Sequence, residues 1–237
     1  MKKFILEKLK ELLAFLAKAT VIKYQPSVIG ITGNVGKTST KEAVYAVLKD
    51  MRSMRVTRGN LNTEFGFPLT ILGDWTNEDL AIVSRYSKSN KLIKIFFWLK
   101  VILVGFKNII LKVEYPEILL LEYGVQKPGD MKYLLDIAKP SIAIMTAIGE
   151  VPAHLEFFDG VGALAREKGR LVEAAPAVGF AILNMDDGLV YEMKDSARAH
   201  VMTFGFNKDA EMRVINLENL STEDRPFGMI AKLGYGG

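Results

Sequence analysis

Apolar residues follow an ordered pattern along most of the chain. From residue 28 onward, short apolar runs typical of buried strands alternate with segments in which apolar residues recur at helical spacing. The predicted strands are 28–32, 117–122, 141–148 and 180–184. The predicted helices are 37–49, with Val44, Val47 and Leu48 on its inner face, 130–138 and 161–174. Strand and helix in alternation predict an α/β fold with a mostly parallel sheet that helices flank on both faces.

The two ends of the chain depart from this alternation. Segments 210–220 and 226–233 predict a late β-hairpin added to the sheet. Segment 4–16 predicts an amphipathic helix, because its apolar residues recur at helical spacing. These residues are Ile5, Leu9, Leu12, Leu13 and Leu16. The chain is therefore predicted to consist of an N-terminal helix, 1–27, and an α/β domain, 28–237.

Two apolar stretches bear on membrane contact. Charged residues interrupt the first stretch, 4–16, so it does not have the continuous apolar core of a signal peptide. The second stretch, 92–111, contains Lys94, Lys100 and Lys107, and lysine at a bilayer centre costs roughly 2.5–3.5 kcal/mol or more. A spanning helix is therefore not expected. Burial against the domain and contact with a membrane surface both stay open for this segment.

Composition excludes several classes of function. The net charge of +4 is small and no stripe of basic and aromatic residues is present, so nucleic acid is not an expected partner. The chain has no cysteine, which excludes disulfides, thiolate catalysis and cysteine-based zinc sites. This composition suits a reducing, cytoplasmic location.

A glycine-rich segment between a predicted strand and a predicted helix is the strongest chemical signal. Gly30, Gly33 and Gly36 precede Lys37-Thr38, which open the helix. Such a loop turns backbone N–H groups toward an anion, its lysine reaches the β- and γ-phosphates, and the Thr38 hydroxyl can bind Mg²⁺. Ile31 stands where the strict phosphate-loop spacing has a glycine. The predicted ATP-binding residues here are Gly33, Asn34, Val35, Gly36, Lys37, Thr38 and Ser39.

Lys168 stands out from the spacing of its own helix. At 100° per residue it falls in the apolar sector of segment 161–174, together with Leu164 and Leu171. The charged residues of this helix are placed on the opposite side: Arg166, Glu167, Arg170 and Glu173. A lysine directed inward either extends its amine back to solvent or has a function, and we favour a function.

Five motifs in order resemble the Mur ligase family. They are Thr32-Gly-Asn-Val-Gly-Lys-Thr-Ser39, Asn60-Leu-Asn-Thr-Glu-Phe-Gly-Phe-Pro68, Leu121-Glu-Tyr-Gly-Val-Gln-Lys-Pro-Gly129, Ala153-His-Leu-Glu156 and Leu183-Asn-Met-Asp-Asp187. Within the family, the chain is most similar to members that add D-alanyl-D-alanine to a UDP-N-acetylmuramoyl-tripeptide. The resemblance runs from about residue 28 to the end and implies the P-loop NTPase-like central domain of these ligases.

The resemblance implies a reaction and a set of site residues. Family members use ATP to phosphorylate a substrate carboxylate, and an amine then attacks the acyl phosphate to form an amide. The substrates implied here are a UDP-sugar-peptide and D-alanyl-D-alanine. Two Mg²⁺ ions are implied, with Thr38, Glu122, His154 and Lys168 as ligands and a carbamate on Lys168. Lys37, His154 and Lys168 are the implied catalytic residues.

Other readings of these residues stay open. Glu122 can instead cap the turn after its strand, and His154 can be an ordinary solvated loop histidine. Asn184 and Asp187 either approach the nucleoside or build a turn. Asn60, Asn62 and Glu64 belong to a loop near phosphates and substrate in the family, in which Thr63 replaces an asparagine.

A whole Mur ligase also has an N-terminal domain that binds the UDP-sugar and a C-terminal domain that closes over ATP. The chain is accordingly expected to be a fragment that does not turn over alone. Two alternatives remain: a superfamily relative such as a folylpolyglutamate synthase, and a nucleotide-binding module without catalysis. Such a module would dock to a membrane surface or partner through 4–16 and 92–111.

Overall fold

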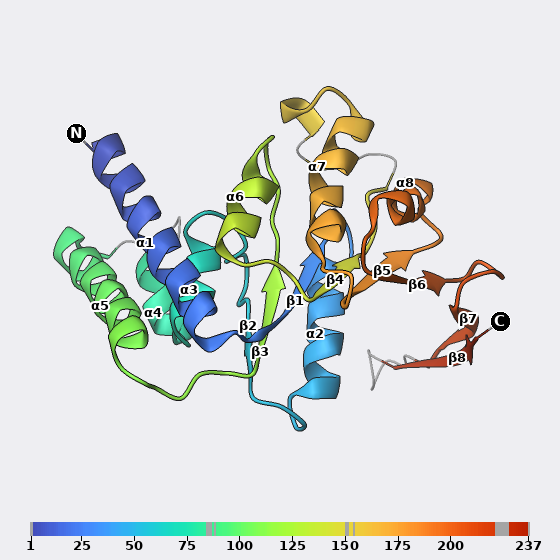
Figure 1. Cartoon of the computed structure of the whole chain (residues 1–237), viewed down its shortest axis with the longest axis horizontal. Coiled ribbons are helices and arrows are strands. Elements are labelled where there is room, and N and C mark those ends of the chain that lie inside the picture. The colour runs from blue at the N-terminus through green and yellow to red at the C-terminus, as the bar shows by residue number, and fades with distance from the viewer. Residues whose placement is uncertain are drawn as a thin grey trace.

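A single eight-stranded sheet organises the chain (Figure 1). The computed structural model describes residues 2–83, 87, 89–149, 152–153, 155–220 and 228–236. The strands are β1 (Ser27–Thr32), β2 (Met54–Val56), β3 (Ile118–Glu122), β4 (Ile142–Met145), β5 (Phe180–Asn184), β6 (His200–Gly205), β7 (Met212–Asn219) and β8 (Met229–Tyr235). Their order is β2-β3-β1-β4-β5-β6-β7-β8, and each neighbouring pair is parallel except the antiparallel pair β7–β8. The predicted α/β class, parallel sheet and late hairpin are confirmed.

Helices lie between most of the strands in sequence. They are α1 (Lys2–Tyr24), α2 (Lys37–Leu48), α3 (Gly66–Leu72), α4 (Asn77–Val83), α5 (Lys91–Ile110), α6 (Asp130–Ile137), α7 (Val161–Ala174) and α8 (Gly188–Tyr191). Two short 3₁₀ helices span Leu155–Phe157 and Glu192–Ser196. In Figure 1, α1 and α5 stand together at one edge of the molecule, and the β7–β8 hairpin lies at the opposite edge.

The sheet has two apolar faces because successive residues of a strand point to opposite sides. On one face, Leu119 and Leu121 belong to a large core shared with α1, α3, α5, α6 and α7. On the other, Ile29, Ile31 and Leu120 form a smaller core with residues of α2. Helices therefore cover both faces, as the alternating pattern predicts.

Helix α1 is part of the larger core. Leu13 and Leu16 are fully buried, whereas Ile5, at the outer end of the predicted apolar face, is 59% exposed. The parallel helix α5 packs beside it, and a side chain at Gly105 would collide with Leu16. The Lys23 amine donates to the Asn108 carbonyl oxygen over 2.8 Å and joins the C-terminal ends of the two helices.

No helix in the described part of the chain combines the length and the apolar composition needed to span a bilayer.

Two predictions about helix faces are wrong in part. In α2, Val44 and Leu48 pack against the smaller core as predicted. Val47, however, is 69% exposed, and the buried residue is Lys41, whose amine donates to the Thr57 carbonyl oxygen over 2.8 Å. In α7, Glu167 is buried rather than directed to solvent. Its carboxylate accepts hydrogen bonds from the N–H groups of Gly129 (2.9 Å) and Met131 (3.0 Å) at the start of α6. In both helices a charged side chain, Lys41 or Glu167, is buried because it forms hydrogen bonds with the backbone of a neighbouring segment. Helical periodicity alone does not predict such contacts.

The strand order reverses at β1, which has β3 on one side and β4 on the other. Ligands of open α/β sheets bind beyond the carboxyl ends of the strands at such a reversal. The glycine-rich loop follows β1, Glu122 ends β3, and residues 146–149 follow β4. The topology therefore brings these three segments together.

Candidate functional site

The loop between β1 and α2 is held in an open turn by two glycines. Gly33 has φ 143° and Gly36 has φ 85°, both in the region that favours glycine. A side chain at Gly33 would overlap the Thr146 hydroxyl. That hydroxyl donates to the carbonyl oxygens of Thr32 (3.1 Å) and Val35 (2.7 Å), so the end of β4 braces both sides of the loop.

The segment after β4 fixes the loop from outside as well. The Asn34 backbone N–H donates to the Ala147 carbonyl oxygen over 2.6 Å, and the Asn34 side chain donates to the Ile148 carbonyl oxygen over 2.9 Å. Val35, Thr38 and Ser39 remain exposed at the loop and the first turn of α2. The start of α2 is thus open to an anion, which backbone N–H groups and the helix dipole favour.

Two lysines share one acceptor at this loop. The Lys37 amine donates to the carbonyl oxygens of Gly33 (2.9 Å) and Asn34 (3.2 Å). The Lys168 amine reaches the same Gly33 oxygen from α7, over 3.0 Å, and its residue is only 2% exposed. The prediction that Lys168 points inward is confirmed.

Burial weakens proton binding by both amines. Burial lowers the pKa of Lys168 to about 7, and the charge of Lys37 lowers it further while Glu122 opposes the change. Burial also lowers the pKa of Lys37, against the attraction of Glu122. Both amines therefore hold their protons less tightly than an exposed lysine does.

Glu122 supplies the negative charge of the site from the end of β3. It is 3% exposed, and its Oε1 atom accepts a hydrogen bond from the Asn62 side-chain amide over 2.8 Å. Its Oε2 atom is buried without a hydrogen-bond partner among the described residues. A buried, unpaired carboxylate oxygen is costly unless a cation or donor meets it, so this atom fits a metal ion.

The Asn60–Pro68 loop reaches the end of β3 through close backbone contact. The Gly124 N–H donates to the Asn62 carbonyl oxygen over 2.8 Å. A side chain at Gly124 would collide with Asn62. Glycine at this position therefore lets Asn62 approach Glu122. Sequence analysis placed Asn62 near the site but missed this pairing, and it missed the role of Thr146 entirely.

Other predicted residues have different positions. His154 lies outside the described residues. The Asn184 side chain accepts a hydrogen bond from the Asp186 N–H over 3.0 Å, as in a turn. The Asp187 carboxylate accepts from the N–H groups of Ile148 (2.7 Å) and Gly149 (3.0 Å) and caps α8. The turn-building reading explains both side chains, and nucleotide binding by Asn184 stays a prediction.

A metal ion at this site would need ligands from the substrate and from water as well as from the protein. No group of three or more His, Asp or Glu side chains that could hold a metal ion is found where the chain is described. Magnesium is commonly bound through one or two carboxylates together with substrate phosphates and water. Glu122 beside an anion-binding loop matches this arrangement.

Known proteins resemble both the sequence and the fold. The model of the Mur ligase middle domain matches residues 31–89 and 103–230. UDP-N-acetylmuramoyl-tripeptide–D-alanyl-D-alanine ligases are 29% identical over 87% of this chain in Synechocystis sp. and 31% identical over 80% in Mycobacterium leprae. The crystal structure of the MurF ligase from Thermotoga maritima in complex with ADP covers 95% of this chain at 26% identity, with a TM-score of 0.69. The chain spans 39% and 30% of the two relatives and 42% of the MurF structure.

Proposed function

Because the chain belongs to the Mur ligase family, we propose that it is the ATP-binding part of an amide ligase of cell-wall peptidoglycan precursor synthesis. The family model matches residues 31–89 and 103–230, and its description is that of the middle domain. The two relatives in Synechocystis and M. leprae are named for joining D-alanyl-D-alanine to a UDP-N-acetylmuramoyl-tripeptide. These substrates are the ones we propose for the complete enzyme, acting in the cytoplasm.

One observation carries the proposal. The open loop with Lys37 faces a buried carboxylate, Glu122, at the reversal point of the sheet, and the Lys168 amine contacts the same loop. An anion site beside an unpaired carboxylate oxygen suits a phosphate chain that binds with a divalent cation. A simple anion-binding turn needs only the loop.

The nucleotide is proposed to bind along residues 33–39. Backbone N–H groups and the start of α2 would hold the β- and γ-phosphates. The Lys37 amine would exchange the Gly33 carbonyl oxygen for a phosphate oxygen, which carries a full charge and is the stronger acceptor. Asn184, at the end of β5, is proposed to lie near the nucleoside.

The residues present fit one of the Mg²⁺ ions that the family implies. Glu122 and the Thr38 hydroxyl would hold the ion at the phosphates, and Lys168 as a carbamate and His154 would hold a second ion by resemblance. When bound, such ions neutralise charge that develops on phosphate oxygens.

The environment of Lys168 supports the carbamate. Only the neutral amine attacks carbon dioxide, forming an N–C bond and releasing a proton. An ordinary lysine is almost entirely protonated at neutral pH, whereas a pKa of about 7 leaves about half of the amine neutral. The product is an anion beside Lys37, which offsets its charge.

The proposed reaction is two successive transfers. A substrate carboxylate oxygen attacks the γ-phosphorus, the bond to ADP breaks, and an acyl phosphate forms. The amine then attacks the acyl carbon and releases inorganic phosphate, leaving an amide. Lys37 and the loop N–H groups hold the transferring group and balance its charge, so the protein needs no nucleophile of its own.

Two other functions are weaker alternatives. A nucleotide-binding module without catalysis would not need Glu122 and Lys168 buried together at the phosphate loop. A folylpolyglutamate synthase-like ligase fits the fold, but the Asn60–Pro68 motif, whose Asn62 contacts Glu122, favours the cell-wall ligase.

Isothermal titration with Mg·ADP tests the nucleotide site. Lys37→Ala removes the amine that contacts the phosphates, and its affinity should fall at least about tenfold, the loss expected for one charge-assisted contact. Lys49→Ala at the other end of α2 is the matched control, because that lysine is exposed and far along the helix. Equal affinity in wild type and Lys37→Ala would refute the assignment.

A further inference from the structure

One side of α5 is an uninterrupted apolar stripe that faces solvent. At 100° per residue its members fall within an arc of about 100°, and 20 helical residues extend about 30 Å. Their exposed fractions range from 41% for Phe106 to 72% for Ile110. The stripe consists of Leu92, Ile95, Phe96, Leu99, Leu103, Phe106 and Ile110.

The opposite side of α5 packs against the domain, so the stripe is directed away from it. Phe97, Val101 and Gly105 are buried, with Gly105 against Leu16 of α1. The Asn108 side chain donates to the Leu72 carbonyl oxygen over 2.9 Å. The helix is therefore already anchored to the domain, and none of the described residues covers its outward side. A continuous exposed apolar surface of this kind marks an interaction site.

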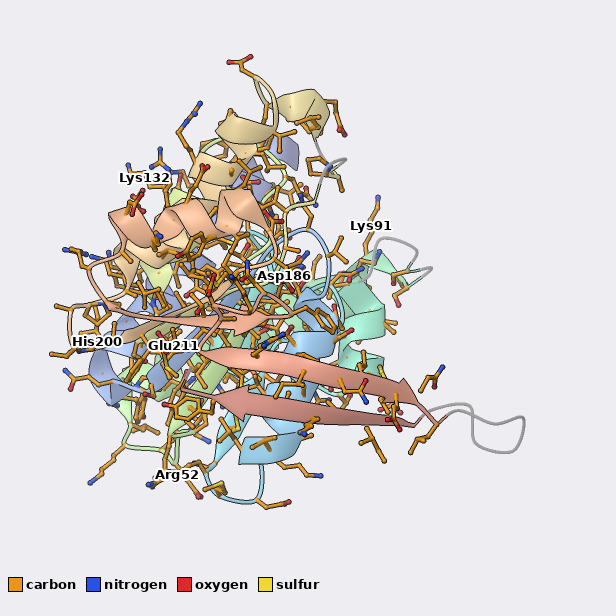
Figure 2. The ribbon with its side chains drawn as sticks, turned by 90° about the vertical axis from the view of Figure 1, so that its right-hand side faces the viewer. Arg52, Lys91, Lys132, Asp186, His200 and Glu211 are labelled. Atoms are coloured by element: carbon orange, nitrogen blue, oxygen red, sulfur yellow. The ribbon has the colours of Figure 1, made fainter. Side chains whose placement is uncertain are left out.

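Charge along the helix indicates the kind of partner. Helix α5 contains four lysines and no acidic residue. Lys100 pairs with Asp79, whereas Lys91 and Lys107 lie beside the stripe near its two ends. Figure 2 shows the Lys91 side chain extending away from the ribbon. An apolar stripe with lysines at its borders matches the acyl chains and anionic headgroups of a membrane surface.

The symmetry of a homodimer argues against a second copy of this chain as the partner. Pairing with a second copy through a two-fold axis would bring Lys91 and Lys107 of both copies into the same contact. Such like charges disfavour the contact.

We propose that α5 lies in the plane of an anionic lipid surface, with its stripe toward the acyl chains and with Lys91 and Lys107 at the headgroups. The helix does not cross the bilayer, because the lysines and the domain on its inner side keep it at the interface. The proposal does not depend on nucleotide binding, so each can fail without the other.

A site-specific fluorophore tests this orientation. The chain has no cysteine, so Leu103→Cys provides a single position for an environment-sensitive dye, and Val47→Cys on α2 provides the control. Phosphatidylcholine vesicles containing phosphatidylglycerol should shift the emission of the Leu103 dye to shorter wavelength and leave the Val47 dye unchanged. No shift at position 103, or equal shifts at both positions, would overturn the proposal.

Vesicle sedimentation separates the apolar and ionic contributions. Phe96→Glu with Leu103→Glu should lower binding at least about tenfold, whereas Val47→Glu with Val178→Glu, at exposed apolar positions outside α5, should not. Lys91→Gln and Lys107→Gln should each lower binding about fivefold on anionic vesicles, and less at high salt. Unchanged binding by the stripe variant would refute the proposal. A second result would also refute it: the wild-type chain forms a dimer without lipid, the stripe substitutions convert this dimer to monomer, and neither protein binds vesicles.

Discussion

Glu122 is buried with one oxygen bound to Asn62 and the other without a donor. Glu122→Gln keeps the shape and removes the charge, so the chain should still fold. Titration should show that Mg²⁺ no longer strengthens ADP binding, with an affinity at least about tenfold below wild type, because the cation loses its carboxylate. Glu117→Gln, at an exposed position just before the same strand, should bind like wild type. Full Mg·ADP affinity in Glu122→Gln would place the metal elsewhere.

Lys168 should make stability depend on pH in the absence of nucleotide, Mg²⁺ and bicarbonate. Burial lowers its pKa from 10.5 to about 7, so the unfolded chain binds more protons than the folded chain between these values. The unfolding free energy should therefore rise with pH across this window, by roughly 1–3 kcal/mol more in wild type than in Lys168→Met. Urea titrations at several pH values measure the difference.

The control for this pH dependence is Lys49→Met, whose exposed amine should leave the slope of wild type unchanged. Parallel curves for wild type and Lys168→Met would show that Lys168 keeps an ordinary pKa.

At this scale the sequence predicts residues better than it predicts their partners. The loop residues, Glu122 and the inward side of Lys168 follow from spacing and resemblance. The Asn62–Glu122 hydrogen bond and the bracing by Thr146 do not, since they depend on how separate loops meet across β1 and β4. Glu167 was predicted to face solvent because helical periodicity does not show that its carboxylate binds the backbone N–H groups at the start of α6.

Among the helices and strands, α1 allows the most direct test of its contribution to the stability of the fold. Leu16 is fully buried against α5, while its neighbour Phe15 is 59% exposed. Leu16→Ala should lower the unfolding free energy by about 2–5 kcal/mol through lost burial and a cavity. Phe15→Ala should change it by no more than about 0.5 kcal/mol. Chemical denaturation measures both, and equal effects would mean that α1 does not contribute to the core.

Element prediction succeeded where an apolar run was long or followed a strong motif. The predicted helix 161–174 has the same bounds as α7, and the predicted strand 180–184 has the same bounds as β5. The short elements β2, α3 and α4 were not predicted, because three to seven residues give too little periodicity. The apolar segment 92–111 was predicted to be buried or at a membrane surface, and α5 has one buried side and one exposed side.

At the level of the whole molecule, the site is assembled from segments spread across the chain. Ligand binding should therefore stabilise the complete fold rather than one loop. Mg·ADP at 100 times its dissociation constant should raise the unfolding free energy by about 2.7 kcal/mol. Thermal melting at a series of ADP concentrations tests this. At the same concentrations Lys37→Ala should show a clearly smaller rise, and an equal rise would mean that ADP binds elsewhere.

The strand order is a whole-molecule property that local sequence pattern did not give. Alternating strands and helices predict a parallel sheet, but they do not say that β3 and β4 flank β1. That order decides which loops share the site. The family resemblance supplied it indirectly, by naming Glu122 and the phosphate loop together.

The Gly33 carbonyl oxygen, which accepts hydrogen bonds from both Lys37 and Lys168, holds the two amines at the phosphate loop. Because both side chains are already ordered there, little side-chain entropy would remain to be lost when a nucleotide binds. If Lys37 turns to a phosphate while Lys168 keeps its free amine, Lys168 still donates to the carbonyl oxygen, and no buried acceptor is left without a donor. In that state one lysine holds the loop in shape after the other has turned away.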